Sequence, residues 1–261
     1  MMNKHIKIIP FGSGSTGNSI YIEIENHRIL VDMGIGMRKI KQALEKHSRS
    51  LNDIEAIFIT HDHYDHIKNA PAIINNTKAL VYCNEETSEY MKNKNIDYCL
   101  LSLNNKKEVL EGLFVEAFKV PHDRYVYGYL FEVGNTRLAY VTDCGTMNNK
   151  IFNYLKKADV VIIESNHDLD MLENGHYDYY LKRRIRSKNG HLSNADCATT
   201  VKKLNDLGIN NFLLAHLSRE NNRPEIALNE TLKALDNKQV NIYVCPVESD
   251  ELLEYRISDS I

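Results

Sequence analysis

Three histidines and two aspartates are concentrated within residues 61–66, in the stretch HDHYDH. His61 and His63 stand two positions apart, so in extended backbone both side chains can point the same way and hold one metal ion. Asp65 and His66 follow after a turn and can face a second ion. Imidazole nitrogen and carboxylate oxygen together suit Zn²⁺, Mn²⁺ or Fe rather than Ca²⁺. The cluster therefore predicts a metal site, and a chance group of surface histidines is the alternative.

Four more acidic or histidine residues stand in the same local context as this cluster. The cluster follows the apolar segment IEAIFIT, and each of the others likewise follows an apolar, strand-like segment. Polar groups gathered at the ends of buried strands are left uncompensated unless something binds them. The recurrence of one context at five places therefore predicts that these side chains meet at one metal centre. The four residues are Asp32, His122, Asp143 and His216.

The segments that carry these residues alternate between strand-like and helix-like patterns. The predicted strands cover residues 5–11, 19–25, 27–32, 54–60, 79–83, 113–120, 128–133, 137–143, 159–165, 209–216 and 240–248. The predicted helices cover residues 37–47, a segment with Pro71 near its start, residues 150–158, a helix from the N-cap Ser193 to Gly208, and a last helix with Pro224 in its first turn. An irregular polar stretch is expected from residue 166 through Asn189.

This order of elements predicts an α/β fold. Two β-rich blocks with interspersed helices are typical of two sheets packed face to face and covered by helices, a four-layer αββα sandwich. No repeat, low-complexity segment or linker divides the chain, so residues 1–261 are expected to form a single domain.

The composition limits the partners and the cellular compartment. A net charge of −3 excludes a protein that holds nucleic acid through an overall basic field. Any phosphate affinity must be local, and the run KRRIRSK at residues 182–188 offers it, although a solvated helix face explains that run about equally well. Five cysteines without a CxxC pair favour a reducing cytoplasm over a disulfide framework. No stretch approaches the length of a membrane span.

The motifs resemble those of the metallo-β-lactamase superfamily, whose HxHxDH signature stands here as His61, His63, Asp65 and His66. The likeness runs from about residue 6 to the C-terminus, with the main motifs of the superfamily in order. The segments GSGSTGNS, ESNHD, NGHY, GHLSN and AHLSRENN are similar to those of the YycJ-like, or WalJ, group, whose members are regarded as metal-dependent DNA exonucleases. The stretch from GHLSN to AHLS also resembles the C-terminal part of ribonuclease Z.

The resemblance implies a role for each of these residues. It implies one divalent ion on His61, His63 and His122. It implies a second ion on Asp65, His66 and His216, with Asp143 bridging the two and Asp32 orienting ligands from behind. The ions would be Zn²⁺ or Mn²⁺ and would share an activated hydroxide that Asp65 steers. His191 would protonate the leaving oxygen, and a helix-flanking histidine satisfied by backbone is its alternative.

The expected function is that of a dinuclear metal-dependent phosphodiesterase acting as a DNA exonuclease. A cyclic-nucleotide or other small-molecule phosphodiesterase of the same fold is the alternative, and RNA ranks below DNA as a substrate. The expected substrate contacts are Ser193, Asn194, Arg183 and Arg184. No membrane is expected as a partner, and a homodimer is left open. A non-catalytic metal-stabilised module is disfavoured because a structural zinc site is closed and mononuclear.

Three further features each allow two interpretations. The segment GSGSTGNS at residues 12–19 lacks the lysine of a P-loop and precedes a strand, so we expect a tight turn near the metals, with phosphate contact as the weaker alternative. His167 and His176 either line the rim of the site or cap loop ends. The tyrosines of HYDYYLKRR, residues 176–184, either stack on bases or pack in the core.

Overall fold

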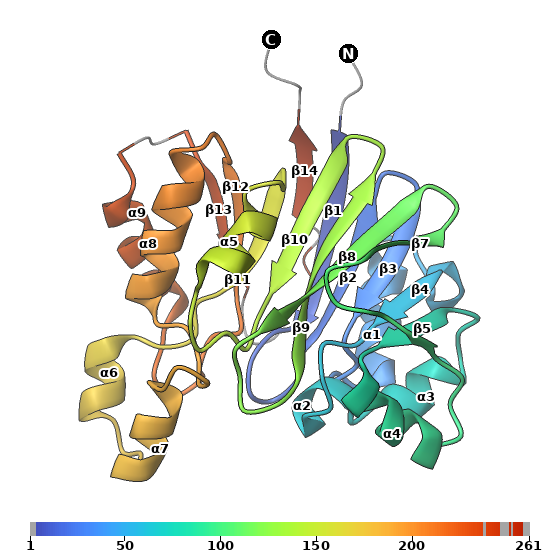
Figure 1. The fold of residues 1–261 in the computed structure, drawn as a ribbon, viewed down its shortest axis with the longest axis horizontal. Helices are drawn as coiled ribbons and strands as arrows, with labels where there is room; N and C mark the ends of the chain where they lie inside the picture. Colours follow the sequence, from blue (N-terminus) through green and yellow to red (C-terminus); the bar gives the residue numbers. More distant parts are fainter. Residues whose placement is uncertain (1–3, 237–238, 246–250, 252, 258–261) are drawn as a thin grey trace.

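Two sheets packed face to face form the centre of the molecule (Figure 1). The computed structural model describes residues 4–236, 239–245, 251 and 253–257. Within these residues the first sheet has the strand order β14-β1-β2-β3-β4-β5-β6 and the second has the order β13-β12-β11-β10-β9-β8-β7. The first sheet comprises β1 (Lys4–Gly12), β2 (Ser19–Ile24), β3 (His27–Val31), β4 (Ala56–Phe58), β5 (Leu80–Cys83), β6 (Cys99–Leu100) and β14 (Leu253–Ile257). The second comprises β7 (Lys106–Leu110), β8 (Leu113–Val120), β9 (Val126–Val133), β10 (Thr136–Val141), β11 (Val160–Glu164), β12 (Asn211–Ala215) and β13 (Asn241–Val244).

Helices cover the outer faces of both sheets (Figure 1). The helices that pack on the first sheet are α1 (Met37–Lys46), α3 (Ala70–Ile74) and α4 (Glu85–Asn93). Those that pack on the second are α5 (Asn149–Leu155), α8 (Asn194–Asn205) and α9 (Pro224–Ala234). A third apolar cluster lies between the sheets, where Phe58 from the first meets Tyr129 and Phe131 from the second. The predicted four-layer αββα sandwich is therefore confirmed.

The topology brings several strand ends to the same edge of the molecule. Strands β3, β4 and β5 run parallel to one another in the first sheet, and β10, β11 and β12 do so in the second. The carboxyl ends of parallel strands meet at one edge of their sheet, which is where open α/β sheets place their ligands. The short helix α2 (Tyr64–Ile67) follows β4 at this edge, and α6 (Leu169–Asn174) and α7 (Tyr179–Ile185) extend beyond it (Figure 1).

Several elements differ from the sequence-based prediction. The polar stretch expected to be irregular contains α6 and α7, which begin at the N-cap residues Asp168 and Asp178. No side chain of α7 is buried, so the helix has no apolar stripe for periodicity to reveal. Helix α4 and strand β7 were not predicted, because α4 has only one buried apolar residue, Met91, and β7 is mostly exposed charge.

The C-terminal strand prediction is also corrected. The chain does not close on a strand at 240–248, because β13 covers only Asn241–Val244 and β14 follows it to pair antiparallel with β1. Residues 246–248 of the predicted strand lie outside the described residues. In the part of the chain that the structure describes, no helix is both long and apolar enough to cross a membrane. The single domain and the cytoplasmic location stay predictions.

Candidate metal centre

Seven histidine and aspartate side chains from both sheets meet at the shared edge. His61, His63 and His122 offer ligand atoms that all lie within 4.8 Å of one another. Asp65, His66 and His216 form a second such group, and Asp143 groups with His61 and His66 and also with His216. All seven residues expected from the sequence are therefore brought together, in two triples with Asp143 between them.

The backbone turns sharply at three of these strand ends. Asp32 follows β3 with φ of 60°, Asp143 lies two residues after β10 with φ of 54°, and His216 follows β12 with φ of 58°. Positive φ is uncommon for residues other than glycine and costs free energy of order 1–3 kcal/mol at each position. This left-handed conformation places a polar side chain at the sheet edge immediately after a buried strand.

Asp32 holds His66 from behind. Its fully buried carboxylate accepts hydrogen bonds from the backbone N–H of Thr60 (2.8 Å) and from Nδ1 of His66 (2.8 Å). Burial lowers the pKa of His66, but the attraction of Asp32 and of Asp143 outweighs it and raises that pKa to about 10. With Nδ1 engaged, Nε2 is the nitrogen that His66 presents to the site. This is the position expected for Asp32.

Glu164 performs a similar task for two histidines, and sequence reasoning did not assign it a role. Its buried Oε1 lies 2.8 Å from Nδ1 of His191 and 2.8 Å from Nδ1 of His216, and its Oε2 accepts from the backbone N–H groups of Cys144 and Leu192. Burial raises the pKa of Glu164, but its contacts with the two histidines outweigh that effect and lower it to about 2. The missed signal was local, because Glu164 ends the apolar strand β11 as Asp32 follows β3.

The glycine-rich segment 12–19 forms part of the site wall. Nδ2 of Asn18 lies 3.0 Å from Oδ2 of Asp65 and 3.0 Å from Nε2 of His66. The hydroxyl of Ser13 accepts a hydrogen bond of 2.7 Å from the backbone N–H of His216. Gly34 leaves no room for a side chain, since a Cβ there would lie 1.6 Å from the carbonyl oxygen of Asp65. The expectation of a turn near the metal site is confirmed.

The donor set fits divalent metal ions. Nε2 of His61, Nε2 of His216 and Oδ2 of Asp143 are buried atoms without a hydrogen-bond partner. Unpaired buried polar atoms are costly, so three of them facing one region indicate that a bound group satisfies them. Burial keeps the pKa of His61 well below its usual value, so that this imidazole is neutral and carries a free lone pair. Imidazole and carboxylate donors are those of zinc and manganese sites.

A cavity of about 250 Å³ opens onto this centre. It is lined by four residues of the two triples, by Asp143 and by His191, whose side chain is 24% exposed. The four are His63, Asp65, His122 and His216. Further lining comes from Tyr177 and from α7, through Leu181, Arg184 and Ile185. Arg184 reaches across to form an ion pair with Asp123, and Asp123 in turn lies 3.1 Å from Nε2 of His122. The sequence predicted Arg184 as a substrate contact, and its position in the cavity wall agrees with that prediction.

The structure does not support substrate contacts by Ser193 and Asn194. Ser193 is buried and is the N-cap of α8, where its hydroxyl bonds to Asp196. Asn194 is buried too; its amide oxygen accepts from Ser165 and Asn222, and its NH₂ group donates to Asn222. Neither residue lines the cavity, because the capping and amide network uses their polar groups to fix the start of α8.

Apart from Tyr177, the other candidate residues lie around the cavity rather than in it. Arg183 faces away from the metals and lines a separate cavity between α6 and α7. His167 is buried, and burial lowers its pKa to about 4, whereas His176 is exposed; neither lines the cavity at the metals. The tyrosines of residues 176–184 are not core residues, because Tyr179 and Tyr180 are 69% and 80% exposed.

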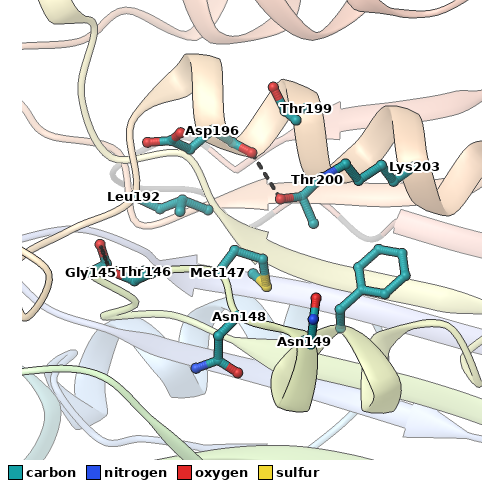
Figure 2. A pocket seen from close by; sticks show the side chains of 11 residues that line it. Gly145, Thr146, Met147, Asn148, Asn149, Leu192, Asp196, Thr199, Thr200 and Lys203 are labelled. Atoms are coloured by element: carbon teal, nitrogen blue, oxygen red, sulfur yellow. Dashed lines mark hydrogen bonds between the residues drawn. The ribbon is translucent and has the colours of Figure 1, made fainter.

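A further cavity of about 340 Å³ lies between α5 and α8 (Figure 2). Asp196, Thr199 and Lys203 of α8 line one side, and Met147 and Asn148 line the other (Figure 2). None of the seven metal-facing residues lines it. It is therefore separate from the cavity that opens onto these seven residues.

Comparison with known proteins identifies relatives of this arrangement. The family model described as the beta-lactamase superfamily domain matches residues 27–217. The chain is 32% identical over 242 residues to exodeoxyribonuclease YycJ of Bacillus anthracis, covering 91% of each chain. It is 34% identical over 224 residues to exodeoxyribonuclease WalJ of Streptococcus pneumoniae strain D39, covering 82% of each.

A solved structure shows the same fold at low sequence identity. The metallo-beta-lactamase fold protein YhfI from Bacillus subtilis superposes with a TM-score of 0.74 at 14% identity, over 96% of this chain and 100% of that chain. At this identity the likeness concerns the fold alone.

Proposed function

The chain belongs to the β-lactamase superfamily, and on this premise we propose that it is a dinuclear metal-dependent phosphodiesterase that acts as a DNA exonuclease. Membership of this family confirms the predicted class of metal-dependent hydrolase. The observation that carries the finer proposal is the convergence of two ligand triples around Asp143, with His191 at the same cavity. The exodeoxyribonuclease names of two relatives that match most of the chain support DNA as the substrate.

We propose that the two triples, together with Asp143, would hold two divalent ions, Zn²⁺ or Mn²⁺. When bound, such a pair of ions activates a water molecule and neutralises charge on a phosphate group. The protein supplies the geometry: Asp32 fixes the ring of His66, and Glu164 fixes that of His216. Carboxylates behind histidine ligands orient the rings and raise their basicity.

His191 is the proposed proton donor to the leaving oxygen. Its Nδ1 is held by Glu164, which leaves Nε2 as the nitrogen able to carry a proton toward the cavity. Histidine suits this step because an imidazole can both accept and donate a proton. Asp65 is the proposed steering group for the attacking water, and its carboxylate is held in place by the amide of Asn18. The guanidinium of Arg184 is placed to contact a phosphate once it releases Asp123.

A small phosphodiester such as a cyclic nucleotide is the second candidate substrate. It is favoured by the volume of the cavity, about 250 Å³, which is at or below the lower end of the range of small-molecule sites. The net charge of −3 also provides no general attraction for a long polyanion.

The test is cleavage by the metal-loaded protein of single-stranded DNA, duplex DNA, RNA and cyclic mononucleotides at equal concentration. Asp65→Ala is the inactive variant, and Asp62→Ala is its matched control, because Asp62 belongs to the same motif but to neither ligand triple. We expect metal-dependent release of nucleotides from DNA ends, lost in Asp65→Ala and kept in Asp62→Ala. Turnover of cyclic nucleotides without cleavage of any oligonucleotide would replace the nuclease with the second candidate.

A further inference from the structure

Helix α7 carries two chemically different faces. Leu181, Arg184 and Ile185 line the cavity at the metals. Tyr179, Lys182, Arg183 and Arg186, together with Glu173 of α6, line a separate cavity of about 430 Å³. Residues three and four apart share one side of a helix, so positions 179, 182, 183 and 186 form one continuous outer face. Because α7 has no buried side chain, packing in the core does not account for this composition.

The outer face concentrates positive charge that the fold does not neutralise. Residues 182–188 include five lysines and arginines and no acid. Three of the five are engaged: Arg184 pairs with Asp123, Arg186 pairs with Glu173, and Lys182 donates to a backbone carbonyl. In the described part of the chain Arg183 and Lys188 are exposed and form no ion pair. Of these two, only Arg183 lies on the outer face, because Lys188 follows the helix and its backbone carbonyl accepts from the hydroxyl of Thr146. On a chain of net charge −3, Arg183 beside Lys182 gives this face a local affinity for phosphate.

Two aromatic side chains of α7 lie four and three positions before Arg183, within one helical turn of it. Tyr179 and Tyr180 are 69% and 80% exposed, and their ring centroids lie 5.8 Å apart. Exposed aromatic rings next to unpaired cations form the surface on which single-stranded nucleic acids bind, because unpaired bases stack on the rings while the backbone follows the charge. Duplex DNA keeps its bases stacked on one another and does not offer them to such rings.

We propose that the outer face of α7 binds the unpaired part of a DNA strand whose end lies in the metal cavity. The inference rests on the proposed nuclease function and adds a second contact region beyond the cleaved nucleotide. The bases stack on Tyr179 and Tyr180, and the phosphates lie against Arg183 and Lys182. The helix is about 10 Å across, so a strand of a few nucleotides extends from one face to the other. The contact expected of Arg183 is thereby moved from the catalytic cavity to this surface.

The experiment compares kcat/KM of the metal-loaded enzyme on a DNA dinucleotide and on a long single strand. The variants are Arg183→Ala and the double variant Tyr179→Ala/Tyr180→Ala. Lys233→Ala is the matched control, because Lys233 is an exposed lysine on α9, which packs on the second sheet, and it lines neither the metal cavity nor the cavity at α7. For the tyrosine pair we expect a loss of at least about 25-fold on the long strand through KM, since each of the two stacked bases is worth about 5-fold or more in binding. For Arg183→Ala we expect the slope of log kcat/KM against log salt concentration on the long strand to become shallower by about 0.7. The ratio of kcat/KM on the long strand to kcat/KM on the dinucleotide should also fall.

The outcomes separate this inference from the proposed function. If wild type cleaves long single strands and both α7 variants do so with unchanged KM, the outer face is not a binding surface and the nuclease proposal stands. Equal losses on dinucleotide and long strand place the effect at the metal cavity or in folding, and overturn the inference. If the tyrosine double variant loses as much kcat/KM on blunt duplex DNA as on single strands, the proposed stacking of unpaired bases is overturned. Failure of wild type to cleave any oligonucleotide removes the nuclease proposal itself.

Discussion

Replacing Glu164 with glutamine tests whether one buried carboxylate supports both the fold and the metal centre. All four groups that contact Glu164 are donors: two histidine Nδ1 atoms on Oε1 and two backbone N–H groups on Oε2. A glutamine has one oxygen and one NH₂ group, so two donors must face an NH₂ in either orientation. Each buried donor left without an acceptor costs about 1–3 kcal/mol. The direct cost to the free energy of unfolding is therefore about 2–6 kcal/mol.

The fold can lower this cost only in a way that damages the site. If the NH₂ group faces the histidines, His191 and His216 can accept its hydrogen bonds through unprotonated Nδ1 atoms. The proton of each neutral ring then lies on Nε2, the atom that His216 presents to the metal centre. A protonated Nε2 offers no lone pair. Changes behind a metal-binding histidine lower metal affinity by 10- to 100-fold as a general rule, and we expect a loss in this range for Glu164→Gln.

The assays are chemical unfolding of the metal-free protein and competition for Zn²⁺ with a chromophoric chelator. Glu132→Gln is the control, because Glu132 also binds two partners, Lys106 and Arg137, but at a partly exposed site where ion pairs contribute about 1 kcal/mol or less. We expect Glu164→Gln to lower both the free energy of unfolding and the affinity for Zn²⁺. We expect Glu132→Gln to change neither by more than about 1 kcal/mol. Wild-type zinc affinity together with an unfolding free energy within about 0.5 kcal/mol of wild type would refute the reasoning.

Three other changes have defined outcomes. Gly34→Ala should destabilise the fold by about 3 kcal/mol and weaken zinc binding, since its Cβ would lie 1.6 Å from the Asp65 carbonyl; unchanged melting and zinc titration would contradict the close approach. Phe58→Ala, at the contact between the sheets, should cost about 3–5 kcal/mol in urea unfolding, and a cost below about 1 kcal/mol would mean that the cluster repacks. Glu23→Gln should cost about 1–3 kcal/mol at neutral pH. Burial raises the pKa of Glu23, but bonds from Arg49 and Tyr21 lower it overall. The stabilisation is therefore present above the unfolded pKa and lost as pH falls through the folded pKa, so the two unfolding curves should converge in acid.

The sequence predicted the ligands and one residue that orients them, Asp32, but not Asn18 or Glu164. His61 and Asp143 were identifiable because their residue type carries the chemistry and their position after an apolar strand is a local property. Asn18 and Glu164 act through partners 48 and 52 positions away in the chain, so the only local signal was the strand end occupied by Glu164. Helix α7 was missed for a related reason, since a helix without a buried face leaves no periodic pattern.

The turns at the strand ends explain why local context nevertheless located the site. Asp32, Asp143 and His216 each adopt positive φ, a conformation that glycine would adopt at less cost. The surrounding structure compensates for this: the N–H of Asp32 donates to Phe58 and that of His216 donates to Ser13, while Glu164 holds the residue after Asp143. Tertiary hydrogen bonds thus keep three acidic or histidine residues in a strained backbone conformation. Such strain is expected where function, rather than stability, has determined the residue type. An acidic or histidine residue directly after a buried strand is thus informative because the fold alone would favour glycine there.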